Sequence, residues 1–291
     1  MPTATHEPDE RRAWLDFALD CADAADDLAL TAFRGAAGAT AKADGTLVTE
    51  TDRAIERLVR ERLAASHPGH GVVGEEYGEE GGRVDVRWFV DPIDGTHNFV
   101  RGIPIFATLL AVEAAGRLEL AVVSAPALGR RWHALRGEGA WVVDGGREAQ
   151  PVRVSTIDQM RDAQVLYSSA QVLATDARIP GFASLVRDCW RERGFGDFWG
   201  YMLVAEGAAE VMIEAGIEPY DLAGPALIVA EAGGQVTDFA GAPDRSGASV
   251  VATNGLVHEE VLRRLGQGAQ GSAGGQEAAA ASASPNVKRP S

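Results

Sequence analysis

Four strand-like segments joined by short turns constrain the fold of this chain more than any other feature. The segments are VRWFV (86–90), FATLLAVE (106–113), LELAVVSA (118–125) and AWVV (140–143), and turns such as AAGR (114–117) and DGGR (144–147) follow two of them. Consecutive strands with short connections pair antiparallel, because a parallel pair needs a longer crossover. The sequence therefore predicts an antiparallel sheet in the first half of the chain.

Helices are expected before this block and alternating elements after it. Apolar residues from Trp14 to Phe33 recur at helical spacing, and a second amphipathic helix is expected at about 52–65. After Pro151, strands are expected at 163–169, 210–214, 234–239 and 248–253, and helices at 182–192, 199–209, 222–233 and 256–265. This order predicts a helix-plus-antiparallel-sheet lobe over residues 11–150 and an α/β lobe over 151–265. A cleft between two lobes is a favoured ligand site.

The two ends of the chain lack the apolar side chains of a packed element. Residues 1–10 are expected to form a flexible polar tail, and the Gly/Ala/Ser-rich residues 266–291 a disordered one. The first residues contain no apolar segment of a secretory signal. No stretch approaches the roughly 18 apolar residues of a membrane-spanning helix. A cytoplasmic location is therefore expected.

The charge of the chain excludes two classes of partner. Asp and Glu number 42 against 27 Lys and Arg, which gives a net charge of −15. Nucleic acids and anionic membranes require basic surface, so neither is expected as a partner. A phosphate ligand would need a bridging cation. The two cysteines, Cys21 and Cys189, are far apart in the sequence and indicate neither a disulfide framework nor a zinc cluster.

The segment WFVDPIDGTHNFVRGIP (88–104) raises the possibility of a metal site. Asp91 and Asp94 follow a strand and flank a proline, and a glycine comes next. Taken alone, this pattern favours an ordinary turn, because Asp side chains bond to their own backbone and Gly accepts positive φ. Thr96 shifts the balance towards a metal site, because it adds a hydroxyl beside the two acids.

Further acids lie in two other segments. Glu75 and Glu76 follow the strand-like GVV (71–73), and Asp221 opens a helix, where a carboxylate is stabilised by the exposed N–H groups. No His or Cys cluster accompanies these acids. Oxygen-only ligands indicate a hard cation, Mg²⁺ or Mn²⁺, rather than Zn²⁺. Mg²⁺ commonly pairs with a substrate phosphate, which predicts a small-molecule phosphate ester as partner.

Three segments resemble, in order, the signatures of the inositol monophosphatase family of magnesium-dependent phosphatases. They are GEE (74–76), WFVDPIDGTHNFVRGIP (88–104) and EAGIEPYDLAGPALIVAEAGG (214–234), and LVTETD (47–52) matches a fourth, shorter element. The resemblance extends over about residues 12–265. It implies a five-layered αβαβα sandwich, of mixed α+β and α/β character, that forms a homodimer.

The resemblance also implies metal ligands. Glu75 and Asp91, with the backbone carbonyl of Ile93, would bind the first ion. Asp91, Asp94 and Asp221 would bind the second, and a third, weaker ion is implied, so that two or three ions occupy the site.

The implied catalytic groups are Thr96, Glu75 and Asp52. Asp52 would lie behind Thr96, hold its hydroxyl and help the third ion, while Thr96 and Glu75 orient a water that the metal activates. The backbone N–H groups of Gly95 and Thr96 would bind the phosphate.

Two positions depart from the family pattern. The family has Trp before the last aspartate, and here the residue is Tyr220, which keeps an aromatic wall. Pro225 falls within the following helix. If that helix begins at about residue 222, Pro225 lies in the first turn, where its missing N–H costs little.

One branch of the family, the bacterial histidinol-phosphate phosphatases, resembles this chain more closely. The resemblance lies in NFVRGIP (98–104), VVSAPALGRRWHALRGEGAW (122–141) and GFGDFWGYMLVAEGAAEV (194–211). It implies that Asp197 and Glu214 bind the amine and imidazole of histidinol phosphate. Two alternatives stay open for these residues: Asp197 as a helix N-cap and Glu214 as a solvated strand end. For the function, the alternatives are an inositol-1-phosphate phosphatase of broad specificity and, less favoured, a catalytically silent regulator that binds metal or phosphate.

Overall fold

The computed structural model describes residues 8–35, 39–41, 47–81, 84–243 and 246–267 of the 291. Most of the two predicted tails, residues 1–7 and 268–291, lies outside the described residues. Helix α1 (Pro8–Ala32) begins at Pro8, so residues 8–10 are helical rather than part of a tail. No helix in the described ranges is long and apolar enough to cross a membrane.

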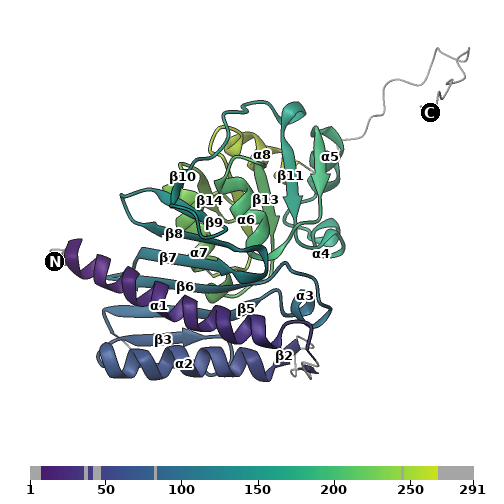
Figure 1. Ribbon diagram of the computed structural model, residues 1–291. Coiled ribbons are helices and arrows are strands. Elements are labelled where there is room, and N and C mark those ends of the chain that lie inside the picture. Colours follow the sequence, from purple (N-terminus) through teal and green to yellow (C-terminus); the bar gives the residue numbers. More distant parts are fainter. Residues whose placement is uncertain (1–7, 36–38, 42–46, 82–83, 244–245, 268–291) are drawn as a thin grey trace, which may run out of the picture.

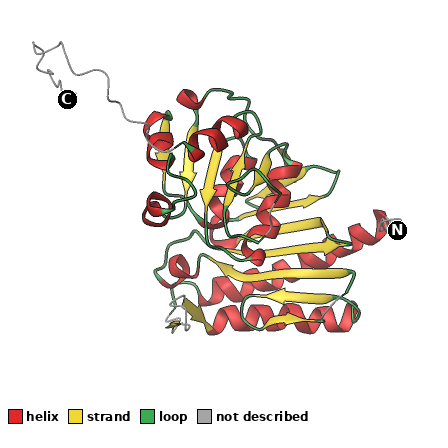
Figure 2. Ribbon diagram, turned by 180° about the vertical axis from the view of Figure 1, so that it is seen from behind, coloured by secondary structure: helices red, strands yellow, loops and turns green. Residues whose placement is uncertain are grey.

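The described elements form five layers, as Figures 1 and 2 show. Helices α1 and α2 (Glu50–Ser66) cover one face of a large sheet, and α6 (Asp197–Ala205) and α7 (Pro219–Glu231) cover the other. A second sheet follows, with α5 (Phe182–Asp188) and α8 (His258–Gly266) on its outer face. The predicted αβαβα sandwich is confirmed.

The large sheet has eight strands in the order β10-β9-β8-β7-β6-β5-β3-β4. Its strands are β3 (Gly71–Gly74), β4 (Gly78–Glu80), β5 (Val86–Asp94), β6 (Ala107–Ala114), β7 (Arg117–Ala125), β8 (Arg130–Leu135), β9 (Ala140–Asp144) and β10 (Gln150–Val152). All neighbours pair antiparallel except β3 and β5, which run parallel. The antiparallel sheet predicted from the short connections is confirmed.

The second sheet has five strands in the order β12-β11-β13-β15-β14. Its strands are β11 (Gln164–Tyr167), β12 (Arg191–Arg193), β13 (Val211–Glu214), β14 (Gln235–Thr237) and β15 (Val250–Thr253). The remaining described elements are the paired strands β1 (Ala39–Ala41) and β2 (Leu47–Thr49), the short helices α3 (Thr96–Val100) and α4 (Ala170–Thr175), and two 3-10 helices, η1 (Pro126–Leu128) and η2 (Met160–Asp162).

Side-chain alternation along two strands points acids into the middle helical layer. On β5, Trp88 and Val90 pack against α1 and α2, whereas Phe89 packs on the side of α6 and α7. Asp91 has the parity of Phe89 and continues that side. On β13, Met212 faces the middle layer, and Glu214 follows it two residues later. Each strand therefore carries, at or near its end, a carboxylate aimed at the space between the sheets.

Several local predictions were wrong or incomplete; for example, the helix expected over 199–209 spans Asp197–Ala205. The helix expected over 182–192 ends at Asp188, because the chain then extends and pairs as β12 with β11. Strand β8 was missed, although buried Trp132 and Ala134 alternate there with half-exposed neighbours.

Helix α7 begins at Pro219 rather than at about residue 222, so Pro225 lies inside the helix. A proline at the first helical position and a capping box between Glu218 and Asp221 explain the earlier start. Because Pro225 has no N–H, the carbonyl of Asp221 receives no bond from it in the helix.

Candidate active site

A cavity of about 170 Å³ lies where the large sheet, the middle helices and the second sheet meet. Its walls contain every predicted site residue except Asp52. The full lining is Leu47, Glu75, Asp91, Ile93, Asp94, Gly95, Thr96, His97, Asp197, Phe198, Tyr201, Glu214, Ile217 and Asp221. Residues more than a hundred positions apart in the sequence are thus assembled around one space.

The parallel pairing of β3 and β5 explains why Glu75 lies beside Asp91. Gly74 pairs with Val90, and the Glu75 N–H donates to the Val90 carbonyl at 3.2 Å. Parallel strands end at the same edge of a sheet. The residues that follow, Glu75 and Asp91, are therefore neighbours at that edge, and Asp221 approaches Asp91 from the first turn of α7.

Asp91 and Asp94 are both buried towards the end of β5. Asp94 is 9% exposed, and its Oδ2 accepts a hydrogen bond of 2.5 Å from the Phe198 N–H at the start of α6. Asp91 is 2% exposed, and its buried Oδ1 accepts no hydrogen bond from any described residue. A buried acceptor of this kind is costly unless something else satisfies it.

The turn after Asp94 requires glycine. Gly95 has φ +83° and precedes the first residue of α3, and a Cβ there would lie 3.0 Å from the Ile105 carbonyl oxygen. This conformation and this close approach both suit glycine alone. The turn at Gly95 places Thr96, the next residue, in the cavity lining.

Thr96 stands between Ile93 and Asp52. Its hydroxyl oxygen lies 2.9 Å from the Ile93 carbonyl oxygen and 3.3 Å from Asp52 Oδ1. A hydroxyl has one proton, so it donates to one of these acceptors at a time. Asp52 is fully buried, and its other oxygen accepts from the backbone N–H of Thr49 at 2.8 Å and from the Thr49 hydroxyl. Burial raises the pKa of Asp52.

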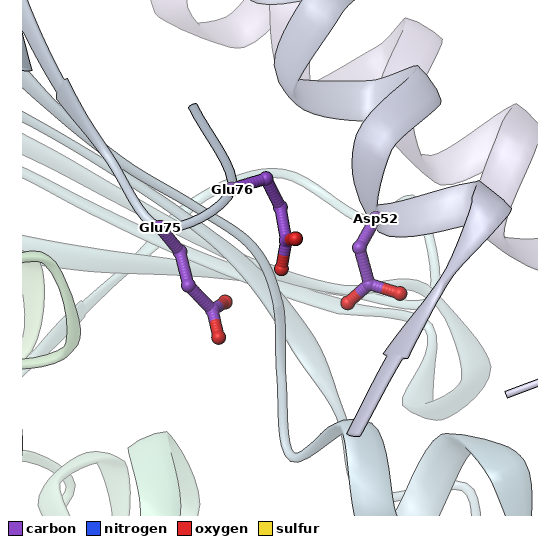
Figure 3. A group of neighbouring side chains, drawn as sticks. All are labelled: Asp52, Glu75 and Glu76. Atoms are coloured by element: carbon purple, nitrogen blue, oxygen red, sulfur yellow. The ribbon is translucent and has the colours of Figure 1, made fainter. Parts of the chain in front are cut away.

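Glu75 also belongs to a group of three acids with Asp52 and Glu76 (Figure 3). Asp52, Glu75 and Glu76 each bring one carboxylate oxygen to within 4.8 Å of the others. The sequence prediction named Glu76 among the acids but gave it no role. Its position directly after Glu75 could have indicated such a role, because in a turn two successive side chains can both point towards α2.

Burial and mutual repulsion raise the pKa values of the central carboxylates. Burial, followed by the charges of Glu75, Asp94 and Asp221, holds the pKa of Asp91 well above its usual range. Burial and the neighbouring Asp197 do the same for the pKa of Asp94. Burial raises the pKa of Asp221 to about 7. Divalent cations would relieve this repulsion and satisfy the buried Asp91 oxygen, so the donor set fits a hard metal ion.

Asp197 and Glu214, from the second half of the chain, also line the cavity. The N-cap of α6 is Gly196, so Asp197 is the first helical residue and not the cap. Asp197 has φ +55°, and its Oδ2 lies 3.4 Å from the Asn98 side-chain nitrogen. Glu214 is 3% exposed at the end of β13, so it is not a solvated strand end.

Tyr201 also lines the cavity and was not predicted from the sequence. It is fully buried on α6, and its hydroxyl donates to Glu214 Oε2 at 2.7 Å. Burial raises the pKa of Glu214 to about 7, and the bond from Tyr201 opposes that rise. Tyr201 lies among apolar residues of α6, so the sequence pattern predicted only that its side chain is buried in the core.

Comparisons with known proteins agree with the geometry. The model of the inositol monophosphatase family matches residues 10–270. A histidinol-phosphatase of Mycobacterium tuberculosis is 44% identical over 256 residues, which is 87% of this chain and 98% of the relative. A histidinol-phosphatase of Streptomyces coelicolor is 41% identical over 251 residues, with 84% and 94% coverage.

A crystal structure of the extragenic suppressor protein suhB from Bartonella henselae superposes with a TM-score of 0.81 at 26% identity. The match covers 88% of this chain and 99% of the other. The family predicted from the sequence motifs is thereby confirmed. The chain belongs to the inositol monophosphatase family.

Proposed function

We propose that this protein is a magnesium-dependent phosphomonoesterase that hydrolyses L-histidinol phosphate to L-histidinol and phosphate in histidine biosynthesis. One observation carries the proposal: a single cavity is lined by six carboxylates, from Glu75, Asp91, Asp94, Asp197, Glu214 and Asp221. Among the lining residues that the structure describes, His97 alone can become a cation. A phosphate dianion would be repelled from such a space unless cations accompany it.

The carboxylates divide into two groups in this proposal. Glu75, Asp91 and the Ile93 carbonyl would hold one Mg²⁺, and Asp91, Asp94 and Asp221 a second. A third, weaker ion would lie near Asp52, and Mn²⁺ could replace Mg²⁺. When bound, these ions lower the pKa of a coordinated water and neutralise charge on the phosphate and the leaving oxygen. The lobe of residues 11–150 would thus supply most of the metal ligands, and the lobe of 151–265 the last one and the specificity residues.

The protein groups around the phosphate have separate tasks. When the Thr96 hydroxyl donates to Asp52, its oxygen can accept a hydrogen bond from the attacking water, and Glu75 can accept the second. The backbone N–H groups of Gly95 and Thr96 would donate to phosphate oxygens. Overall, one P–O bond forms to the water oxygen and the ester P–O bond breaks. A proton from the water ends on the leaving-group oxygen, which becomes the hydroxyl of the alcohol product.

Asp197 and Glu214 would face the organic part of the substrate. Histidinol carries an amine and an imidazole, and carboxylates form charge-assisted hydrogen bonds to both. A bound cation stabilises the ionised form of a buried acid, so it would keep Glu214 charged at neutral pH. The names of the two relatives at 44% and 41% identity support the same substrate.

A side-by-side assay tests this proposal. Phosphate release from L-histidinol phosphate and from inositol 1-phosphate should be measured with Mg²⁺ at equal enzyme concentration. We expect the larger kcat/KM on histidinol phosphate. A larger value on inositol phosphate would favour the broad-specificity alternative, and no release from either ester would favour a silent metal- or phosphate-binding regulator.

We also infer that the enzyme works as a homodimer in the cytoplasm. The family resemblance supports the dimer, and a biosynthetic phosphate ester as substrate supports the location. Light scattering on the purified protein, with fractionation of the cells that produce it, tests both points.

A further inference from the structure

A carboxylate outside the cavity, Glu56, binds the backbone of the loop that carries Glu75 and Glu76. Glu56 is on α2 and is fully buried. Its Oε2 accepts the Glu76 N–H at 2.6 Å, and its Oε1 accepts the Tyr77 N–H at 3.2 Å. A buried carboxylate is unfavourable unless it is paired and hydrogen-bonded, so these contacts decide whether Glu56 can stay there.

Glu56 lies on the same face of α2 as Asp52. The two residues are four positions apart on α2, so both side chains leave the helix in the same direction. Asp52 reaches the Thr96 hydroxyl, and Glu56 reaches the loop after β3. The single helix therefore fixes the spacing between Asp52 and the two glutamates with which it clusters.

Arg60 and Gly74 complete this arrangement. Arg60 Nε donates to Glu56 Oε1 at 2.8 Å, and the same guanidinium bonds to Glu80 at 3.0 Å and to the Gly78 carbonyl. Gly74 leaves room for the Glu56 carboxylate, because a Cβ on residue 74 would lie only 2.1 Å from Glu56 Oε1. The carboxylate thus packs directly against the backbone that leads into Glu75.

We propose that Glu56 is a positioning residue that fixes the loop 74–77 in the conformation that binds the metal ions. The inference rests on the proposed metal-dependent function. Glu56 is not among the residues that line the cavity. It acts through the N–H groups of Glu76 and Tyr77, and its loss would let Glu75 move away from Asp91.

The test is metal binding by the Glu56→Gln variant. Gln keeps the shape but offers one acceptor oxygen in place of two, so its amide group would meet an N–H donor of the loop. Mutation of a residue that hydrogen-bonds to a metal ligand typically lowers metal affinity by about 10- to 100-fold. We expect the Kd for Mn²⁺, measured by calorimetry without substrate, to rise by about that factor. Turnover should recover at saturating metal.

The matched control is Glu80→Gln. The Glu80 side chain is 76% exposed and accepts from the same Arg60, but no N–H group of the described loop donates to its carboxylate. Its Kd for Mn²⁺ should equal that of the wild type. A second variant, Glu56→Asp, keeps the charge while withdrawing the carboxylate by one methylene, and it should also bind Mn²⁺ more weakly.

Denaturant unfolding of the EDTA-treated variants separates positioning from simple stability. A folded Glu56→Gln or Glu56→Asp protein with wild-type Kd for Mn²⁺ would overturn the inference, even if it unfolds more easily. A wild-type protein that binds no Mn²⁺ and turns over in EDTA would instead overturn the proposed function together with this inference.

Discussion

At the scale of single residues, the site depends on acids that the fold buries before any ligand arrives. Asp91 shows this most clearly, because its pKa is raised well above the usual range by burial and by three neighbouring acids. Its Oδ1 has no hydrogen-bond donor among the described residues. Such a residue destabilises the metal-free protein and becomes favourable only with a cation.

The Asp91→Asn substitution should separate these two effects. Turnover should fall by at least about a hundredfold, because Asp91 would contact both ions and such contacts contribute several kcal/mol. The fold should stay intact, and the metal-free variant should melt no earlier than the wild type. Circular dichroism and phosphate release check both expectations. Turnover within about tenfold of wild type at saturating Mg²⁺ would contradict the two-metal assignment.

Asp197 decides between a cationic and a neutral substrate. Losing one charge-assisted hydrogen bond costs about 1.5–3 kcal/mol, so Asp197→Asn should raise KM for histidinol phosphate by about 10- to 100-fold. KM for glycerol 2-phosphate, which carries no cation, should stay nearly unchanged. Equal losses on both esters would mean that Asp197 shapes the cleft instead of binding the substrate.

At the scale of elements, the turn between β5 and α3 positions Gly95 and Thr96, the groups that we propose bind the phosphate. Gly95 must adopt positive φ there, and the Ile105 carbonyl leaves no room for a side chain. The DGT segment signalled this turn in the sequence. The sequence could not reveal that Asp94 caps α6 through Phe198, because that bond joins residues 104 positions apart.

Gly95→Ala and Gly116→Ala form a matched pair for testing the turn. Both glycines have positive φ, +83° and +76°, but only Gly95 has a backbone atom at close approach. The left-handed conformation should cost each variant about 1–2 kcal/mol of unfolding free energy. Only Gly95→Ala should also lose activity. Comparable activity in the two variants would show that the turn does not present groups to the phosphate.

At the scale of the whole molecule, two sheets and a helical layer converge on one acidic space. Local patterns predicted the antiparallel sheet, the long helices and the acids that follow strands. They could not predict the β12 strand after Asp188 or the neighbouring positions of Asp197 and Glu214, because both depend on long-range pairing. Family motifs supplied the architecture that periodicity alone left open.

The acidity of this space should make the stability of the metal-free protein depend on pH. Burial raises the pKa values of Asp221 and Glu214 to about 7, above roughly 3.9 and 4.3 in unfolded chains. The folded state therefore binds more protons between about pH 4 and 7, and the unfolding free energy contributed by these groups falls as the pH rises through that range.

Urea unfolding in EDTA at pH 5 and pH 7.5 measures this effect. The wild type should lose more stability between the two pH values than Asp221→Asn, which lacks one of the titrating groups. Mg²⁺ should restore stability at pH 7.5. Equal pH dependence in both proteins would contradict the electrostatic account of the cavity.

The dependence of turnover on metal tests the central claim most directly. Phosphate release from L-histidinol phosphate should be followed in the purified protein, after EDTA treatment, and again after Mg²⁺ is added in excess. The carboxylate cavity predicts loss of turnover in EDTA and recovery with Mg²⁺, because the phosphate cannot approach six acids without cations. Full turnover in EDTA would show that these carboxylates serve the fold and that the proposed chemistry is wrong.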